Sequence, residues 1–223
     1  MKLGMLQSLN VSLLESVPFG KKEVVTGINK KPYSGALLLG MTGLPGDAQG
    51  DTVFHGGPDK AVCVYSAVHF PYWADRWERA VLPGAFGENF TVSALTEHSV
   101  CIGDTVAIGH ALVQVSQPRQ PCFKLGMKHG LPGLQLDVEE TGFTGFYFRV
   151  LQEGFVAEGD ALTLQKRHPA GITVAEANRV MHTDKRDRDG IVRLLAVGEL
   201  AESWRQSLTK RLAKLDEEAE SGG

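Results

Sequence analysis

One short proline-rich segment, SQPRQPCFK, carries the residues with the clearest capacity for chemistry. It places Arg119, Cys122 and Lys124 close together, directly after a run of strand-forming residues. Pro118 and Pro121 fix the backbone and prevent further strand pairing, so the segment is a stiff loop at a strand end. Neighbouring cations favour the thiolate of a cysteine over its thiol. We therefore predict that Cys122 is a reactive thiolate, either a metal ligand or a nucleophile, and not a packing residue.

A second segment, HGGPDKA, begins at His55 and contains Lys60. Two glycines and a proline before an apolar run make a tight turn whose backbone N–H groups can point at an anion. Lys60 adds a point charge that suits a phosphate group. His55 is a candidate metal ligand or cofactor contact.

Asn89 lies in a third segment, FGENF, which leads into a short strand. Its amide offers both a donor and an acceptor for the edge of a heterocycle. Taken alone, the second and third segments are ordinary turns. They are candidates for a functional site only if the fold brings them close to Cys122.

Two kinds of chemistry remain open for Cys122 from the residues themselves. A cysteine–histidine enzyme would pair it with a histidine such as His55 or His129. A soft metal could instead bind one protein thiolate if other sulfur ligands come from a cofactor, with the basic residues holding that cofactor.

The cysteine count and the charge narrow the class of protein. Three cysteines, Cys63, Cys101 and Cys122, are an odd number in 223 residues, with no CxxC pattern, which argues against a disulfide framework, a zinc site or an iron–sulfur cluster. Each cysteine is then either a buried small apolar side chain or a reactive thiolate. The net charge of −3 gives no general attraction to nucleic acid. No apolar run could span a bilayer and no secretion signal is evident, so we expect a cytoplasmic protein.

Two regions must position these residues. Residues 1–166 are rich in glycine, with short apolar runs between turns, which is typical of a β-barrel or sandwich. Within this region, residues 145–151 and 161–165 are expected to form a strand pair. Residues 167–216 have helical periodicity and predict a small three-helix unit, opened by the capping-box pattern TVAE at Thr173. Residues 217–223 are expected to be a disordered tail.

The helical unit does not have the charge of a DNA-binding domain. Residues 166–223 contain 11 Lys and Arg against 10 Asp and Glu, a balance of +1. A recognition helix usually lies in a more basic background. The composition favours a packing or interface module over nucleic-acid binding.

The motifs taken together resemble the MOSC domain family, specifically its YiiM type. The resemblance rests on HGGPDKAV at 55–62, FGENF at 86–90, IGD at 102–104 and VSQPRQPCFKL at 115–125, in this order. It covers nearly the whole chain, including the helical unit. It implies a mainly β fold with added helices, namely a pyruvate-kinase-like β-barrel of the MOSC type followed by the three-helix domain.

The resemblance also implies a function. Members of this class bind the molybdenum cofactor, a pyranopterin whose dithiolene supplies two sulfurs, and Cys122 matches the cysteine that adds another. By the same match, Cys63 and Cys101 would be packing residues. Lys60, Asn89, Arg119, Lys124 and His55 would bind the cofactor, with Tyr65 as a further pocket residue. The implied reaction is reduction of N-hydroxylated compounds such as 6-hydroxylaminopurine, with electrons from an external redox partner protein. The alternative is a cofactor carrier or sulfur-relay protein without turnover of its own.

Overall fold

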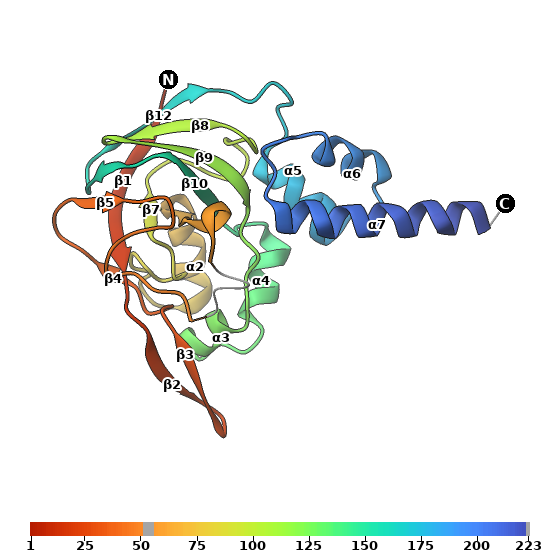
Figure 1. Ribbon diagram of the computed structural model, residues 1–223. Helices are drawn as coiled ribbons and strands as arrows, with labels where there is room; N and C mark the ends of the chain where they lie inside the picture. Colours follow the sequence, from red (N-terminus) through yellow and green to blue (C-terminus); the bar gives the residue numbers. More distant parts are fainter. Residues whose placement is uncertain (51–55, 222–223) are drawn as a thin grey trace.

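A closed barrel of seven strands forms the body of the protein. The computed structural model describes residues 1–50 and 56–221. The strands follow the order β12, β8, β9, β10, β6, β7, β1, and β1 pairs back to β12 to close the ring (Figure 1). Their bounds are β1 Lys2–Val11, β6 Val62–Ser66, β7 Phe90–Val92, β8 Thr105–Ile108, β9 Ala111–Pro118, β10 Phe146–Gln152 and β12 Ala161–Lys166. The β6–β7 pair is parallel, and the other neighbours are antiparallel. The expected fold class is confirmed.

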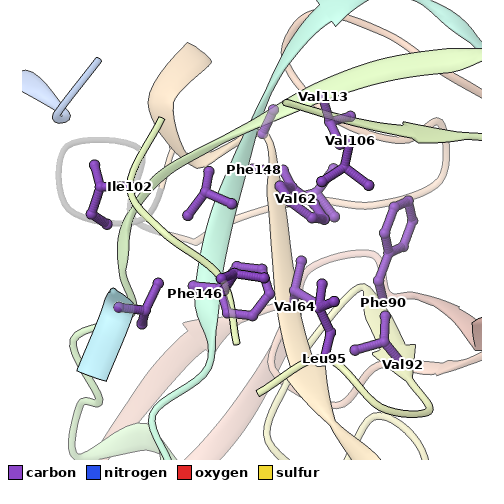
Figure 2. Packing of buried hydrophobic residues seen from close by; sticks show 14 of the residues in the cluster. Val62, Val64, Phe90, Val92, Leu95, Ile102, Val106, Val113, Phe146 and Phe148 are labelled. Atoms are coloured by element: carbon purple, nitrogen blue, oxygen red, sulfur yellow. The ribbon is translucent and has the colours of Figure 1, made fainter. Parts of the chain in front are cut away.

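Alternating side chains from these strands fill the barrel. Along β9, for example, Ala111, Val113 and Val115 are buried while the residues between them are partly exposed, the period of two that a strand requires. Phe146 and Phe148 of β10 lie beside Val62 and Val64 of β6 in the interior (Figure 2). The barrel is therefore packed solid, and a functional site must lie outside its interior.

The expected pairing of residues 145–151 with 161–165 is wrong. Both segments are strands, β10 and β12, but β10 pairs with β9 and β6, whereas β12 pairs with β8 and β1. Between them the chain forms a further strand, β11 (Gly154–Val156), which pairs with β5 (Leu37–Leu39).

Two small elements extend the barrel at its N-terminal side. Strand β4 (Lys31–Pro32) adds to β1. Strands β2 (Glu15–Phe19) and β3 (Lys22–Thr26) form a hairpin that projects from the barrel (Figure 1). The loop that follows β3 returns toward the barrel and forms part of the site described below.

Helices and aromatic side chains cover one side of the barrel. A 3-10 turn, η1 (Pro58–Lys60), precedes β6, and a second, η2 (Ala67–His69), leads into α2 (Phe70–Trp77). Helices α3 (Lys124–His129) and α4 (Leu134–Thr141) pack with α2 around a second apolar cluster. Tyr65 lies in this cluster, stacked on Phe86 at 3.9 Å and accepting a hydrogen bond of 2.6 Å from Trp73 Nε1.

The C-terminal unit contains the three predicted helices. Helix α5 (Val174–Asn178) continues into a π-helical turn at Arg179–Thr183 and is followed by α6 (Arg188–Leu195) and α7 (Glu202–Ser221). Thr173 Oγ1 accepts a hydrogen bond of 3.0 Å from Glu176 N, as the capping pattern predicts. Side chains of this unit, including Ile191 and Trp204, belong to the same apolar cluster as the barrel core. The unit is thus packed onto the barrel rather than tethered to it.

The expected disordered tail at 217–223 is wrong for its described part. Helix α7 continues to Ser221 (Figure 1). Its last turns carry strong helix formers, and Glu218 forms ion pairs with Arg186 at 2.9 Å and with Lys214 at 3.9 Å. These contacts lie beyond Leu215, the last residue of the predicted apolar face, where periodicity alone suggested an end of the helix. No helix in the described ranges is both long and apolar enough to cross a bilayer.

Candidate functional site: a cationic cleft at Cys122

The three sequence segments meet at one cleft on the outside of the barrel. The cleft holds about 560 Å³ of empty space, a volume that includes open solvent at its mouth. Lys60, Asn89, Arg119, Cys122 and Lys124 all line it. His55 lies outside the described residues. The remaining lining comes from Lys30, Cys63, Gly87, Tyr147 and the segments 26–28 and 48–50.

Cys122 lies on the loop between β9 and α3. Strand β9 ends at Pro118, and the Arg119 N–H donates to the Gly145 carbonyl at 3.0 Å, which holds the loop to β10. The Cys122 carbonyl in turn accepts from Leu125 N at 3.0 Å as α3 begins. The side chain is half-buried, so its sulfur reaches the cleft without being sealed in the core. This placement is what a ligand or nucleophile requires.

Arg119 lies deepest among the cations of the cleft. Only 6% of it is exposed, and its Nη1 has no hydrogen-bond partner among residues 1–50 and 56–221. Burying a guanidinium N–H without an acceptor is costly. The arrangement is therefore suited to an anionic group that enters the cleft and accepts from Arg119.

Cys63 shares the cleft with Cys122, which the sequence did not suggest. It is 6% exposed, as a packing residue should be, yet it contributes to the lining. Burial raises the pKa of its thiol to about 11, and burial likewise raises the pKa of the neighbouring Tyr147 hydroxyl. Both groups are therefore neutral donors near pH 7. Cys101 is remote from the cleft, buried at 4% exposure, and accepts from Arg167 at 3.2 Å.

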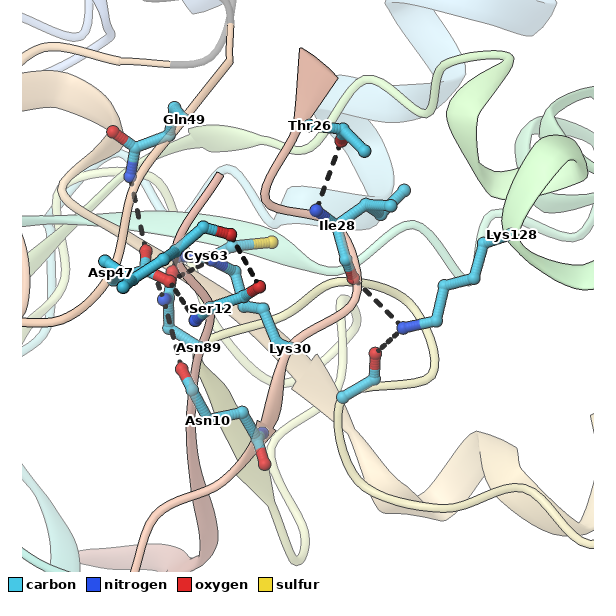
Figure 3. Close-up of polar contacts among 12 residues, drawn as sticks. Asn10, Ser12, Thr26, Ile28, Lys30, Asp47, Gln49, Cys63, Asn89 and Lys128 are labelled. Atoms are coloured by element: carbon cyan, nitrogen blue, oxygen red, sulfur yellow. Dashed lines mark hydrogen bonds and ion pairs between the residues drawn. The ribbon is translucent and has the colours of Figure 1, made fainter. Parts of the chain in front are cut away.

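Asn89 is tied into the cleft wall by both ends of its amide (Figure 3). Its Oδ1 accepts from Cys63 N at 3.1 Å, and its Nδ2 donates to Asp47 Oδ2 at 2.9 Å. Asp47 also forms a buried ion pair with Lys30. The expected cofactor contact of Asn89 stays a prediction, since the structure shows this amide organising the wall.

Lys30 and Asp47 could not be found from the sequence, because no motif marks them. They arrive through two loops that lie against each other. A Cβ added to Gly27 would lie 2.0 Å from the Ala48 carbonyl oxygen, so only glycine permits this approach. Lys128 of α3 closes the same wall by donating to the Ile28 carbonyl at 3.0 Å (Figure 3).

A cysteine–histidine pair with His129 is not formed. The Nε2 of His129 contacts the Ala85 carbonyl at 2.8 Å, and its Nδ1 contacts Arg79 at 3.0 Å. His129 is not among the residues that line the cleft, and neither is Tyr65, whose expected place in the pocket is wrong. Tyr65 is fully buried in the second apolar cluster instead.

Two family models and several similar proteins match this chain. The MOSC domain matches residues 51–163, and the YiiM-like 3-alpha helix domain matches residues 172–215. The uncharacterized protein YflK of Bacillus subtilis is 48% identical over 93% of this chain and 94% of its own length. Protein YiiM of Escherichia coli is 37% identical over 89% of this chain and 88% of its own.

One relative is named as an enzyme, and one similar protein has a solved crystal structure. A "Reductase" of Gibberella moniliformis is 34% identical over 71% of this chain, which spans only 29% of that longer protein. The crystal structure of YiiM from Geobacillus stearothermophilus superposes with a TM-score of 0.80 at 38% identity, covering 93% of this chain and 98% of that one. The chain therefore belongs to the MOSC domain family and, with its C-terminal helical domain, to the YiiM type.

Proposed function

We propose that this protein is a molybdenum-cofactor-dependent reductase of N-hydroxylated compounds, such as the base analogue 6-hydroxylaminopurine. The observation that carries the proposal is the half-buried Cys122 in a cationic cleft with the buried Nη1 of Arg119, which has no hydrogen-bond partner in the part of the chain that the structure describes. Membership of the MOSC family and similarity to a protein named "Reductase" support an oxidoreductase.

The residues of the cleft fit such a cofactor. Cys122 supplies one soft thiolate ligand. Within the described ranges no group of three or more His, Cys, Asp or Glu side chains gathers to hold a metal ion, and we propose that the dithiolene of the cofactor supplies the other sulfur ligands. Lys60, Lys124 and Arg119 supply positive charge for its anionic groups, and Arg119 offers an N–H that no described residue accepts. When bound, the cofactor would supply the two-electron redox chemistry that removes an N-bound oxygen as water.

The protein's own residues would position the bound cofactor and neutralise its negative charge. Lys30 is already paired with Asp47 and therefore belongs to the wall. The neutral Cys63 thiol and Tyr147 hydroxyl provide donors without adding charge at the floor of the cleft. The sequence has no flavin or nicotinamide fingerprint, so we propose that electrons come from an external redox protein.

The test is metal analysis combined with a cysteine substitution. Protein produced in a host that makes the cofactor should contain molybdenum and pterin, and should reduce 6-hydroxylaminopurine with a chemical reductant such as dithionite-reduced viologen. Cys122→Ser should abolish turnover while the fold is kept. Cys101→Ser, which alters a buried cysteine outside the cleft, is the matched control. Full activity of Cys122→Ser would refute the assigned role, and cofactor transfer to an acceptor enzyme without turnover would favour the carrier function instead.

A further inference from the structure

The C-terminal helical unit contacts the barrel at two of the chain segments that supply cations to the cleft, those of Lys60 and Arg119. The contacts come from the turn that enters α7, residues 199–203, here called the junction segment. Its Ala201 N–H donates to the Ser116 carbonyl at 3.0 Å, and Ser203 Oγ donates to Gln117 Oε1 at 3.2 Å. Gln117 lies two residues before Arg119, so the junction segment holds the end of β9 where the cysteine loop begins.

Asp59 connects the same junction segment to the turn that carries Lys60. Its Oδ2 accepts from Glu202 N at 3.0 Å. Its Oδ1 accepts from Arg149 Nε at 3.0 Å and Nη2 at 2.5 Å. Arg149 also donates through Nη1 to the Glu199 carbonyl at 2.8 Å. Asp59 is therefore clamped between a barrel strand and the helical unit.

The backbone of this turn is tied as well. The Asp59 carbonyl accepts from Ser116 Oγ at 2.5 Å, and the same hydroxyl contacts the Tyr147 carbonyl at 3.2 Å. The 3-10 turn η1 is only three residues long, Pro58–Lys60, so an anchor at Asp59 fixes the origin of the next side chain. That side chain, Lys60, lines the cleft.

We propose that Asp59 is a positioning residue through which the helical unit sets the place of Lys60 in the cleft. Asp59 does not line the cleft itself. It acts through the backbone of η1, and the junction segment acts through Asp59 and Arg149. The inference rests on the proposed use of the cleft to hold an anionic group, and it gives the C-terminal unit a role in that site beyond packing.

The experiment measures how inorganic phosphate protects Cys122 from alkylation in the full-length, cofactor-free protein. Iodoacetamide is uncharged, and mass spectrometry of the peptide that contains Cys122 reports its rate of modification. Lys60→Ala should raise the phosphate concentration for half-protection on the order of tenfold, the loss of one charged contact. Asp59→Ala should raise it about threefold, because Lys60 remains but is less well held.

Non-additivity separates positioning from a general structural effect. If Asp59 acts through Lys60, Asp59→Ala should add nothing in the Lys60→Ala background. Asp59→Asn, which keeps the size and one acceptor, should lie between wild type and Asp59→Ala and serves if the alanine variant folds poorly. Arg188→Gln is the matched control, since it removes an exposed ion pair with Asp216 at 2.8 Å inside the same helical unit. It should leave protection unchanged.

Two results would overturn the proposal in distinguishable ways. If Lys60→Ala weakens protection while Asp59→Ala does not, or if their effects are fully additive, Asp59 does not position Lys60 and the proposed function is untouched. If phosphate fails to protect Cys122 even in the wild type, both the anion-holding cleft and the positioning role fall.

Discussion

Replacing Arg119 by methionine should separate folding from binding at the cleft. Arg119 is 6% exposed and leaves Nη1 without a partner among the described residues. An unsatisfied buried donor costs about 1–3 kcal/mol. Methionine carries no charge and no donor but is shorter than arginine, and the imperfect packing that it leaves costs about 1 kcal/mol of that gain. We therefore expect Arg119→Met to raise the free energy of unfolding of the cofactor-free protein by about 1 kcal/mol.

Urea unfolding measures this change directly. The midpoint should move to higher urea with an unchanged slope, because the surface exposed on unfolding stays the same. The same variant should lose protection of Cys122 by inorganic phosphate, since the deepest cation of the cleft is gone. Stability and binding would thus move in opposite directions, as expected for a charge kept for function.

Arg149→Met is the control for a partly buried arginine whose side chain is paired with several acceptors. Arg149 donates to Asp59, to Gln114 at 3.1 Å and to the Glu199 carbonyl. Its loss should lower the free energy of unfolding by about 2 kcal/mol, because the partners are left unpaired. If Arg119→Met is destabilised as much as Arg149→Met, or if it still shows phosphate protection, Arg119 is a structural residue and the reasoning is refuted.

Three further changes test the walls and caps of the fold. Burial lowers the pKa of Lys128 from 10.5 to about 8, so between these pH values the unfolded chain holds a proton that the folded chain lacks. The free energy of unfolding of the wild type, relative to that of Lys128→Gln, should therefore rise with pH across this window in urea titrations. A flat or falling difference would contradict this expectation. Thr173→Ala removes the N-cap of α5 and should cost about 1 kcal/mol in thermal unfolding, against no change for an exposed Ser-to-Ala control. Gly27→Ala would place a Cβ 2.0 Å from the Ala48 carbonyl oxygen, so it should displace the cleft wall and weaken phosphate protection; unaltered protection would show that the two loops separate freely.

Local chemistry made part of the site predictable. The prolines around Cys122 stop β9 at Pro118 wherever the strand lies in the barrel. The Thr173 cap forms within one helical turn, so its spacing in the sequence was sufficient. A turn or helix cap whose partners lie within a few residues forms in the same way whatever the long-range order of the strands.

Predictions that needed long-range neighbours were wrong or missing. Tyr65 was expected in the pocket, but stacking on Phe86 draws it into the second apolar cluster. The strands β10 and β12 are successive long strands of the chain, yet a closed barrel gives each of them other partners. Neither outcome follows from periodicity, because periodicity reports burial and not the identity of the neighbour.

The sequence by itself determined that Cys122 stands on a stiff, cation-flanked loop after a strand, because proline geometry and adjacent charge are local properties. Only the tertiary structure decided what faces that cysteine. Pairing of β6 with β10 places Cys63 opposite Tyr147 at the same cleft, and two loops from the N-terminal region add the Lys30–Asp47 wall. The junction segment of the helical unit then reaches Asp59 across 143 positions of sequence. Contacts of that range exist only when hydrophobic packing has already fixed the elements that carry them, so no local pattern can record them.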